Sequence, residues 1–244
     1  MDEQNIIPSL DDLWDYFDRI FCISLEDRAD RRRSAREQFR KVGLLERVEF
    51  VIEKKHPTNS EQGIFESHMR CIRAGIKTDA QTMIIFEDDV IFDRFDTSIL
   101  QDCIRFLASN SSWKLFFLGC IVDSSQETEH RSVLQVCYRG LTHAYVINRS
   151  FSEILIEQTW KNTPYDTMLR TLSPHYHAVY PAFAFQSNAR TDNMRFLKRD
   201  RIRRLFGGLE RIQKLNEWYI RNRAFVIGLH IMAIVILTIL VIWY

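Results

Sequence analysis

Residues 83–92 read Met-Ile-Ile-Phe-Glu-Asp-Asp-Val-Ile-Phe and join a short apolar run to three consecutive carboxylates. The run Met83–Phe86 is continuously apolar, as expected of a central strand that is covered on both faces of a sheet. Glu87, Asp88 and Asp89 follow it directly, and neighbouring carboxylates repel one another. A divalent cation relieves such repulsion, and hard oxygen ligands suit Mg²⁺ or Mn²⁺. A solvated acidic turn with a helix-capping role explains the same spacing equally well.

On both sides of this stretch, short apolar runs alternate with helical patterns over residues 19–194. Strands are expected at Ile20–Leu25, Val48–Ile52, Met83–Phe86, Leu115–Leu118, Val133–Cys137 and Ala144–Ile147, and near Ala178–Phe185. Helices are expected at Ala29–Val42, Gln62–Thr78, Thr97–Ala108, Arg149–Thr159 and Thr163–Leu172, and a short one at Leu10–Phe17. The alternation predicts one α/β domain with a mostly parallel sheet and helices on both faces. Ligands of such sheets bind at the carboxyl ends of the strands.

Charge is distributed unevenly along the 244 residues, although the formal net charge is only +1. Residues 195–223 carry ten Lys or Arg against three Asp or Glu, and the rest of the chain is acidic. The five cysteines show no metal-binding spacing, which is typical of buried thiols in a reducing compartment. Nucleic-acid binding is a poor account of the basic segment, because little else in the chain is basic.

The last 21 residues, 224–244, contain no charged side chain. As a helix they would extend about 31 Å, which matches the hydrocarbon thickness of a bilayer. A membrane span is therefore the preferred interpretation, and a buried core helix is the alternative. Because the basic residues all precede the span, the positive-inside tendency places residues 1–223 in the cytoplasm.

Between the α/β domain and the span, apolar residues recur at steps of three and four. They are Ile202, Leu205, Phe206, Leu209, Ile212, Leu215 and Tyr219. Interleaved arginines and lysines make this a basic amphipathic helix that could lie on anionic headgroups. A surface helix packed on the domain is the alternative. We therefore expect three parts: a domain over 1–194, a juxtamembrane segment over 195–223 and a transmembrane helix over 224–244.

Six short patterns in order resemble glycosyltransferase family 25, the lipopolysaccharide-type and collagen-type β-galactosyltransferases. The first is Ile-Ser-Leu-Glu-Asp-Arg-Ala-Asp-Arg-Arg at 23–32, in which Ser24 and Glu26 depart from the family's pattern. The others are Gly63 with Ser67-His68, the carboxylates at 87–89, Thr142–Ile147, Asp166 in Pro-Tyr-Asp, and Pro181 with Gln186 and Thr191-Asp192. Together they span roughly 170 residues. The basic segment and the apolar tail lie outside the resemblance.

The resemblance implies a GT-A-like, Rossmann-like mixed sheet with helices on both faces. It implies an inverting transferase that moves a hexose, galactose above all, from a UDP-sugar to a hydroxyl group. The acceptor could be a saccharide, a lipid-linked saccharide or a protein. Mn²⁺ or Mg²⁺ on Asp89 and Asp88 would neutralise the diphosphate leaving group.

Inversion requires a general base, for which the resemblance suggests Asp166, with Asp192 as the second candidate. Asp166 could instead cap a helix. Donor binding would fall to Leu25, Arg28, Arg31, Ser67, His68, Glu87, Asp88, His143 and Gln186. The arginines could instead be a solvated helix start, and His68 a buried helix residue.

Two other functional classes remain open. The departures at Ser24 and Glu26 allow a catalytically degenerate, membrane-anchored protein that binds nucleotide sugars or acts as a scaffold. The three carboxylates alone would also suit a metal-dependent phosphohydrolase or nuclease, but supporting His or Lys residues at a useful spacing are missing.

Overall fold

The computed structural model describes residues 13–189, 203–204 and 207–243. Its main sheet has eight strands in the order β2-β1-β3-β8-β5-β9-β7-β6. The strands are β1 (Arg19–Leu25), β2 (Val48–Glu53), β3 (Thr82–Glu87), β5 (Leu115–Phe117), β6 (Ile121–Glu127), β7 (Val133–Gly140), β8 (Ala144–Asn148) and β9 (Tyr176–Val179). A separate antiparallel pair joins β4 (Val90–Phe92) to β10 (Ala184–Gln186).

The sheet is mixed, which confirms the fold class that the family resemblance implies. The expectation of a mostly parallel sheet, drawn from the strand–helix alternation alone, is wrong. The parallel pairs are β1 with β2, β1 with β3, and β5 with β9. β8 runs antiparallel to both β3 and β5, and β7 runs antiparallel to β9 and β6. For β6 and β7 the reason is that a short connection without a helix joins them, whereas parallel neighbours need a long crossover connection.

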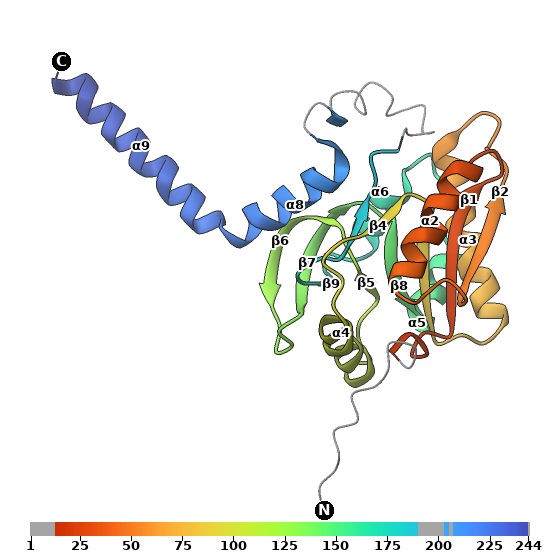
Figure 1. Cartoon of the computed structure of the whole chain (residues 1–244). Coiled ribbons are helices and arrows are strands. Elements are labelled where there is room, and N and C mark those ends of the chain that lie inside the picture. The colour runs from red at the N-terminus through yellow and green to blue at the C-terminus, as the bar shows by residue number, and fades with distance from the viewer. Residues whose placement is uncertain (1–12, 190–202, 205–206, 244) are drawn as a thin grey trace, which may run out of the picture.

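Helices cover both faces of the sheet, as predicted (Figure 1). Phe39 of α2 (Ala29–Lys41) and Phe106 of α4 (Thr97–Ser109) share one core with Ile84 and Phe86 of β3. The alternate residues of β3, Met83 and Ile85, point to the opposite core, because successive side chains of a strand alternate between faces. That second core includes α3 (Ser60–Lys77), α5 (Arg149–Ile156) and α6 (Tyr165–Leu172).

The strands and helices predicted between residues 20 and 185 all exist, and most bounds agree within a few residues. Three helices begin at side chains that accept hydrogen bonds from first-turn amides: Asn59 for α3, Asp96 for α4 and Asn148 for α5. The final expected strand is two strands, β9 and β10. β4 and β6 are additional, and of the helix predicted at Leu10–Phe17, residues 10–12 lie outside the described residues.

The helix α8 (Gly208–Arg221) packs on the domain through polar side chains. Gln213 is only 1% exposed and donates to the Ala184 carbonyl at 2.8 Å. Asn216 exchanges hydrogen bonds with the backbone of Val122, and Glu217 pairs with Arg94. Two of its apolar side chains, Leu215 and Trp218, are more than half exposed. For residues 208–221, the packed surface helix is therefore the alternative that the structure supports.

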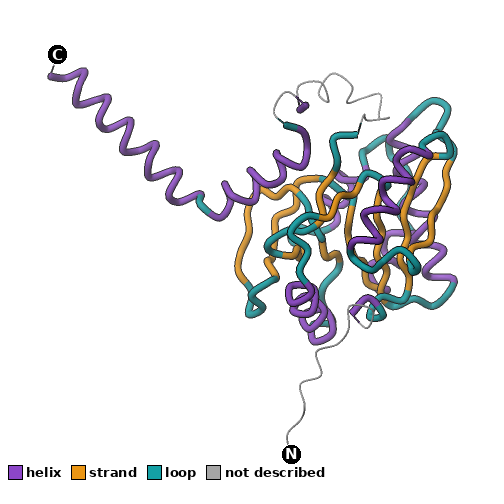
Figure 2. Tube along the Cα trace, in the orientation of Figure 1, coloured by secondary structure: helices purple, strands orange, loops and turns teal. Residues whose placement is uncertain are grey.

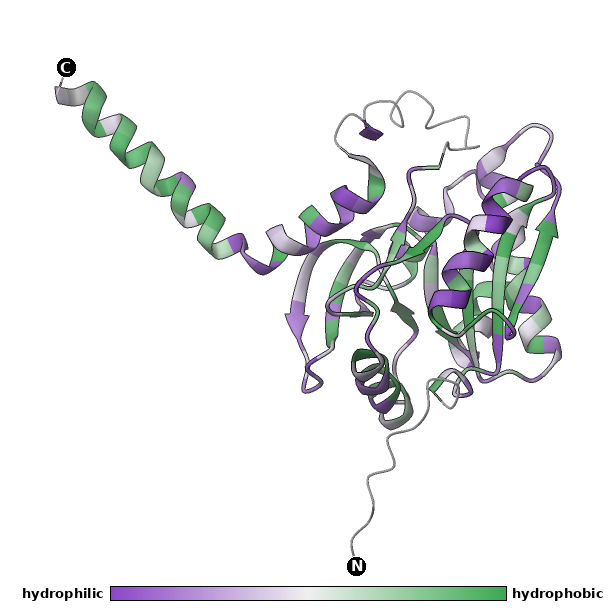
Figure 3. Ribbon diagram, in the orientation of Figure 1, coloured by the Kyte–Doolittle hydropathy of each residue, from purple (hydrophilic) through white to green (hydrophobic). Residues whose placement is uncertain are grey.

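The helix α9 (Arg223–Trp243) extends away from the domain and joins α8 through a short loop (Figure 2). Hydrophobic residues make up most of its length (Figure 3). The segment Arg223–Val241 has a mean hydropathy of 2.8 and is not buried against the rest of the chain. By length and composition it is a candidate membrane span, whereas the predicted boundaries at 194 and 223 stay predictions.

Gly119 lies where β5 leads toward β6, under the contact between β10 and α8. A Cβ at Gly119 would lie 1.8 Å from the Ala184 carbonyl oxygen and 2.5 Å from Gln213 Nε2. Gly119→Ala should therefore lower the free energy of unfolding by roughly 1–3 kcal/mol, as overpacking usually does. Urea denaturation of the purified protein measures this, and Gly228→Ala is the control, because nothing lies within 4 Å of its added Cβ. Equal stability of the two variants would contradict the packing described for β10 and α8.

Candidate active site

A cavity of about 360 Å³ opens at the carboxyl ends of β1 and β3. Its lining also includes the loop after β2, one side of α3, the connection from β7 to β8, the start of α6, and β10. Arg203, which precedes α8, and Leu209, in the first turn of α8, also line the cavity. The parallel strands β1 and β3 end side by side, which is why residues 64 positions apart can meet there.

Buried charges form the floor of this cavity. Arg31 Nε lies 2.8 Å from Asp88 Oδ1, and a terminal nitrogen of the same guanidinium pairs with Asp89 Oδ2. The three side chains are 12%, 6% and 9% exposed. Burial raises the pKa of Asp88 to about 6, although Arg31 and Ser24 oppose the shift. Arg31 therefore does not belong to a solvated helix start.

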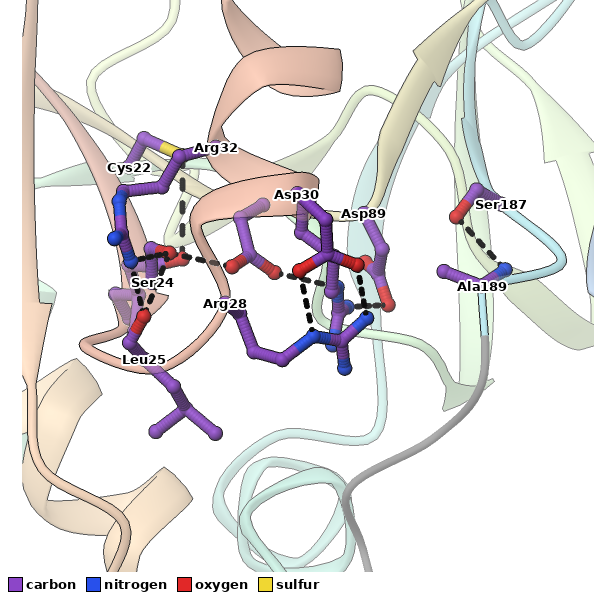
Figure 4. A network of polar contacts seen from close by, with 12 residues as sticks. Cys22, Ser24, Leu25, Arg28, Asp30, Arg32, Asp89, Ser187 and Ala189 are labelled. Carbon is purple, nitrogen blue, oxygen red and sulfur yellow. Dashed lines mark hydrogen bonds and ion pairs between the residues drawn. The ribbon is translucent and has the colours of Figure 1, made fainter.

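Two neutral side chains complete this charged cluster. Ser24 Oγ donates to Asp88 Oδ2 at 2.6 Å, and Gln186 Nε2 donates to Asp89 Oδ2 at 3.0 Å. Ser24, which departs from the family's pattern, is thus a direct partner of a cavity carboxylate. Figure 4 shows Ser24 beside Arg32 and Leu25, and Arg28 facing Asp30. Asp89 Oδ1 is buried, and none of the residues that the structure describes donates a hydrogen bond to it.

Asp166 lies in the cavity wall and is held by three donors. Tyr138 Oη and Thr142 Oγ1 donate to its Oδ1 at 3.0 and 2.9 Å, and the Leu141 amide donates to its Oδ2 at 3.1 Å. α6 begins at Tyr165, and the residue before it makes no side-chain cap. The carboxylate of Asp166 is therefore fixed against the β7–β8 connection instead of capping a helix.

His68 is almost fully buried in the cavity wall, at 1% exposure. Its ring stacks on Tyr165 at 4.3 Å between centroids, and its Nδ1 lies 2.9 Å from Tyr145 Oη. Burial lowers the pKa of His68 to about 3, so the ring is neutral at physiological pH. Its Nε2 lies 3.5 Å from Glu87 Oε1, and burial, reinforced by Asp89, raises the pKa of Glu87.

Most of the residues predicted for the site line the cavity. They are Leu25, Arg31, Ser67, His68, Glu87, Asp88, Asp89, Asp166 and Gln186. Arg28 and His143 are not in the lining: Arg28 is paired with Asp30, and His143 is completely buried. Asp192 lies outside the described residues. The roles assigned to all of these residues stay predictions.

The sequence reasoning missed several cations of the cavity wall, namely Lys54, Lys55, Arg139 and Arg203. Lys54 and Lys55 directly follow β2, which is parallel to β1 and ends at the same edge of the sheet. The rule that placed Arg31 and Asp89 at the site applies equally to this pair. Arg139 could not be found in this way, because its strand, β7, pairs only with antiparallel neighbours.

The described side chains of the cavity provide only part of the ligand set that a divalent cation needs. Among the residues that the structure describes, no three His, Cys, Asp or Glu side chains form a metal-binding group. The Asp88 and Asp89 carboxylates nevertheless suit Mg²⁺ or Mn²⁺, which bind through one or two carboxylates when substrate phosphates supply further oxygens. Asp89 Oδ1, which has no hydrogen-bond partner within the described part of the chain, could be one such ligand. The residues present therefore fit such a cation in a complex with a phosphate-bearing ligand.

The buried His68 should make the protein sensitive to acid. Its pKa in the folded protein lies below its value of about 6.5 in the unfolded chain, so protonation favours unfolding. Stability is full above about pH 6.5 and falls by up to about 2 kcal/mol by pH 5. His68→Gln should reduce this loss in urea titrations at pH 7 and pH 5, whereas the exposed control His175→Gln should not. An unchanged acid response in His68→Gln would contradict the burial of a neutral ring.

Comparison with known proteins adds the family. A model described as glycosyltransferase family 25 (LPS biosynthesis protein) matches residues 44–169, slightly more than half of the chain. No curated protein matches the sequence. Among solved structures, A197 from STIV is similar with 13% identity and a TM-score of 0.44 over 69% of this chain and 85% of that one. A glycosyltransferase involved in the glycosylation of the major capsid of PBCV-1 is similar with 12% identity and a TM-score of 0.42, over 75% of this chain and 99% of that one. Because the family model matches more than half of the chain, the chain belongs to glycosyltransferase family 25.

Proposed function

We propose that this member of glycosyltransferase family 25 transfers a hexose from a UDP-sugar to an acceptor hydroxyl, with inversion at the anomeric carbon. The observation that carries the proposal is the cavity at the ends of β1 and β3, where acidic and basic side chains converge. Lys54, Lys55 and Arg31 offer positive charge for a diphosphate, for which guanidinium and ammonium groups are suited partners. Galactose is the hexose that the family resemblance favours.

Asp89 and Asp88 are proposed to hold Mn²⁺ or Mg²⁺. The cation would supply Lewis-acid stabilisation of the departing diphosphate. The neighbouring residues keep the two carboxylates in place: Ser24 anchors Asp88, and Gln186 anchors Asp89. Neither contact depends on the cation.

Asp166 is proposed to accept the proton of the acceptor hydroxyl as that oxygen attacks the anomeric carbon. Its carboxylate lies in the cavity wall and is oriented by Tyr138, Thr142 and the Leu141 amide. A base that is already oriented saves the entropy of ordering it for the reaction. The ring of His68 stacks on Tyr165, the residue before Asp166, and its lowered pKa keeps it neutral. His68 therefore suits a role in shaping the cavity wall better than a role as a second acid or base.

A donor screen tests this function. Purified protein with Mn²⁺ and an added sugar acceptor should release UDP from one of UDP-galactose, UDP-glucose and UDP-N-acetylglucosamine. Asp166→Asn should lower kcat by two to four orders of magnitude, the usual contribution of a general base. The control is Asp102→Asn, whose carboxylate bonds Ser132 and His130 and does not line the cavity.

The outcomes separate the alternatives. Full turnover by Asp166→Asn would contradict its role and leave Asp192 as the base. Binding of a UDP-sugar by the wild-type protein without any turnover would instead identify a catalytically degenerate member of the family.

We further propose that α9 anchors the domain to a membrane, with residues 1–223 in the cytoplasm. Leu215, Trp218 and Tyr219 lie exposed on α8, beside the basic residues Arg211 and Arg223 that precede or begin the apolar helix. This combination is typical of a surface that meets anionic headgroups. The acceptor would then be a saccharide or protein held at the same membrane surface, and a lipid-linked saccharide fits best.

Fractionation tests the anchor. The full chain should stay in the membrane pellet after alkaline carbonate, whereas a chain ending at Asn222 should be soluble. The shortened chain should keep its turnover of a soluble acceptor, because α8 binds the domain through its own polar contacts. Extraction of the full chain by carbonate would contradict the membrane-spanning role of α9.

A further inference from the structure

The Arg31 guanidinium occupies the oxygens that a divalent cation would need. It pairs with Asp88 Oδ1 and with Asp89 Oδ2, and the whole group is largely removed from solvent. Arg31 belongs to the first turn of α2, whereas the two carboxylates follow β3. The pairing therefore joins two elements across the floor of the cavity, and neither sequence segment predicts it alone.

Counted over the residues that the structure describes, the cluster holds more negative than positive charge. The Arg31 guanidinium faces two carboxylates, and Ser24 and Gln186 contribute neutral hydrogen bonds. Asp89 Oδ1 remains buried and has no hydrogen-bond partner among the described residues, a condition that is costly for an ionised carboxylate. The excess negative charge of the cluster favours the binding of a second cation, although the Arg31 guanidinium blocks access to two of the carboxylate oxygens.

A cation and Arg31 cannot both hold the same oxygens at close range without repelling one another. A diphosphate in the cavity removes this conflict, because it offers Arg31 a new anionic partner. Lys54 and Lys55 line the same cavity and add to the attraction for such an anion. Binding of the diphosphate would therefore draw Arg31 away and leave the carboxylates to the cation.

We propose that Arg31 is an internal counter-cation that makes divalent-cation binding depend on the diphosphate of the donor. The proposal rests on the metal-assisted UDP-sugar chemistry proposed above. Without nucleotide, Arg31 neutralises Asp88 and Asp89 and keeps the cation affinity low. With nucleotide, Arg31 moves to the phosphates, so each ligand strengthens the binding of the other by the same factor.

Binding of Mn²⁺ alone, followed by electron paramagnetic resonance, tests the idea without any turnover. Arg31→Gln should bind Mn²⁺ about tenfold more tightly than the wild type, because the competing charge is gone, while UDP alone should bind more weakly. The coupling factor between Mn²⁺ and UDP, which is above one in the wild type, should fall toward one. Arg31→Lys keeps the charge and should keep the low affinity for Mn²⁺.

Stability provides a second readout. Metal-free Arg31→Gln leaves two buried carboxylates without their counter-ion and should have a lower Tm than the wild type. Mn²⁺ should restore more of that Tm than it adds to the wild type. The matched control is Arg36→Gln on the same helix, whose guanidinium lies 4.5 Å from the centroid of the Phe50 ring. It should change neither the Mn²⁺ affinity nor the Mn²⁺-dependent gain in Tm.

The outcomes distinguish this inference from the proposed function. Unchanged or weaker Mn²⁺ binding by folded Arg31→Gln, with normal UDP-sugar turnover by the wild type, would overturn the role of Arg31 alone. A wild-type protein that binds neither Mn²⁺ nor UDP, separately or together, would overturn both.

Discussion

Three consecutive carboxylates at the end of a buried strand must be stabilised in a largely dehydrated place. β3 lies between β1 and β8, and its side chains up to Phe86 are covered on both faces. Glu87, Asp88 and Asp89 therefore emerge where little water is available, and ionised groups there need partners. Each partner comes from a different element: Ser24 from β1, Arg31 from α2 and Gln186 from β10. The electrostatics of one turn thus determine where four elements meet.

The same constraint extends to the C-terminal part of the chain. β10 carries Gln186 and is held on its other side by Gln213 of α8 through the Ala184 carbonyl. Gly119 permits this approach, because any side chain there would meet the Ala184 carbonyl. The helix α8, which precedes the apolar α9, is consequently part of the support for Asp89. A short series of contacts, from Gln213 to the Ala184 carbonyl and from Gln186 to Asp89, connects α8 to the cavity.

The sequence predicted the elements that bury continuous apolar runs or have clear helical periodicity. β3 and β8 were predictable because each is an almost continuous run of buried residues. α3 was predictable because its buried apolar residues recur at helical spacing. β6 was missed because it is an edge strand whose residues are mostly exposed and polar, and β4 because three residues are too few for a pattern. The strand order was not predictable, since β8 pairs with β3 and β5, from which other strands separate it along the chain, and composition does not specify such long-range pairing.

For the site, the sequence identified which residues end buried strands, but not how they pair. Asp88, Asp89 and Arg31 were all expected at the cavity, yet their mutual ion pairs depend on the angle at which α2 leaves β1. Asp166 was ambiguous between base and helix cap until its three donors were placed. His143 adjoins Thr142, which faces Asp166, but it is completely buried outside the cavity lining. Successive side chains near the end of a strand point in opposite directions. Spacing along the sequence alone does not tell which of two neighbouring residues faces the cavity.

The central claim is that the cavity at the ends of β1 and β3 receives the diphosphate of a nucleotide sugar together with a divalent cation. A crystal structure of the protein with UDP and Mn²⁺, with the metal located by its anomalous scattering, measures this most directly. The account predicts that Mn²⁺ contacts Asp89, that the diphosphate lies between it and the cavity cations, and that Arg31 has left the carboxylates for the phosphates. Mn²⁺ or UDP bound at another place, with the Arg31–Asp88–Asp89 cluster unchanged, would contradict it.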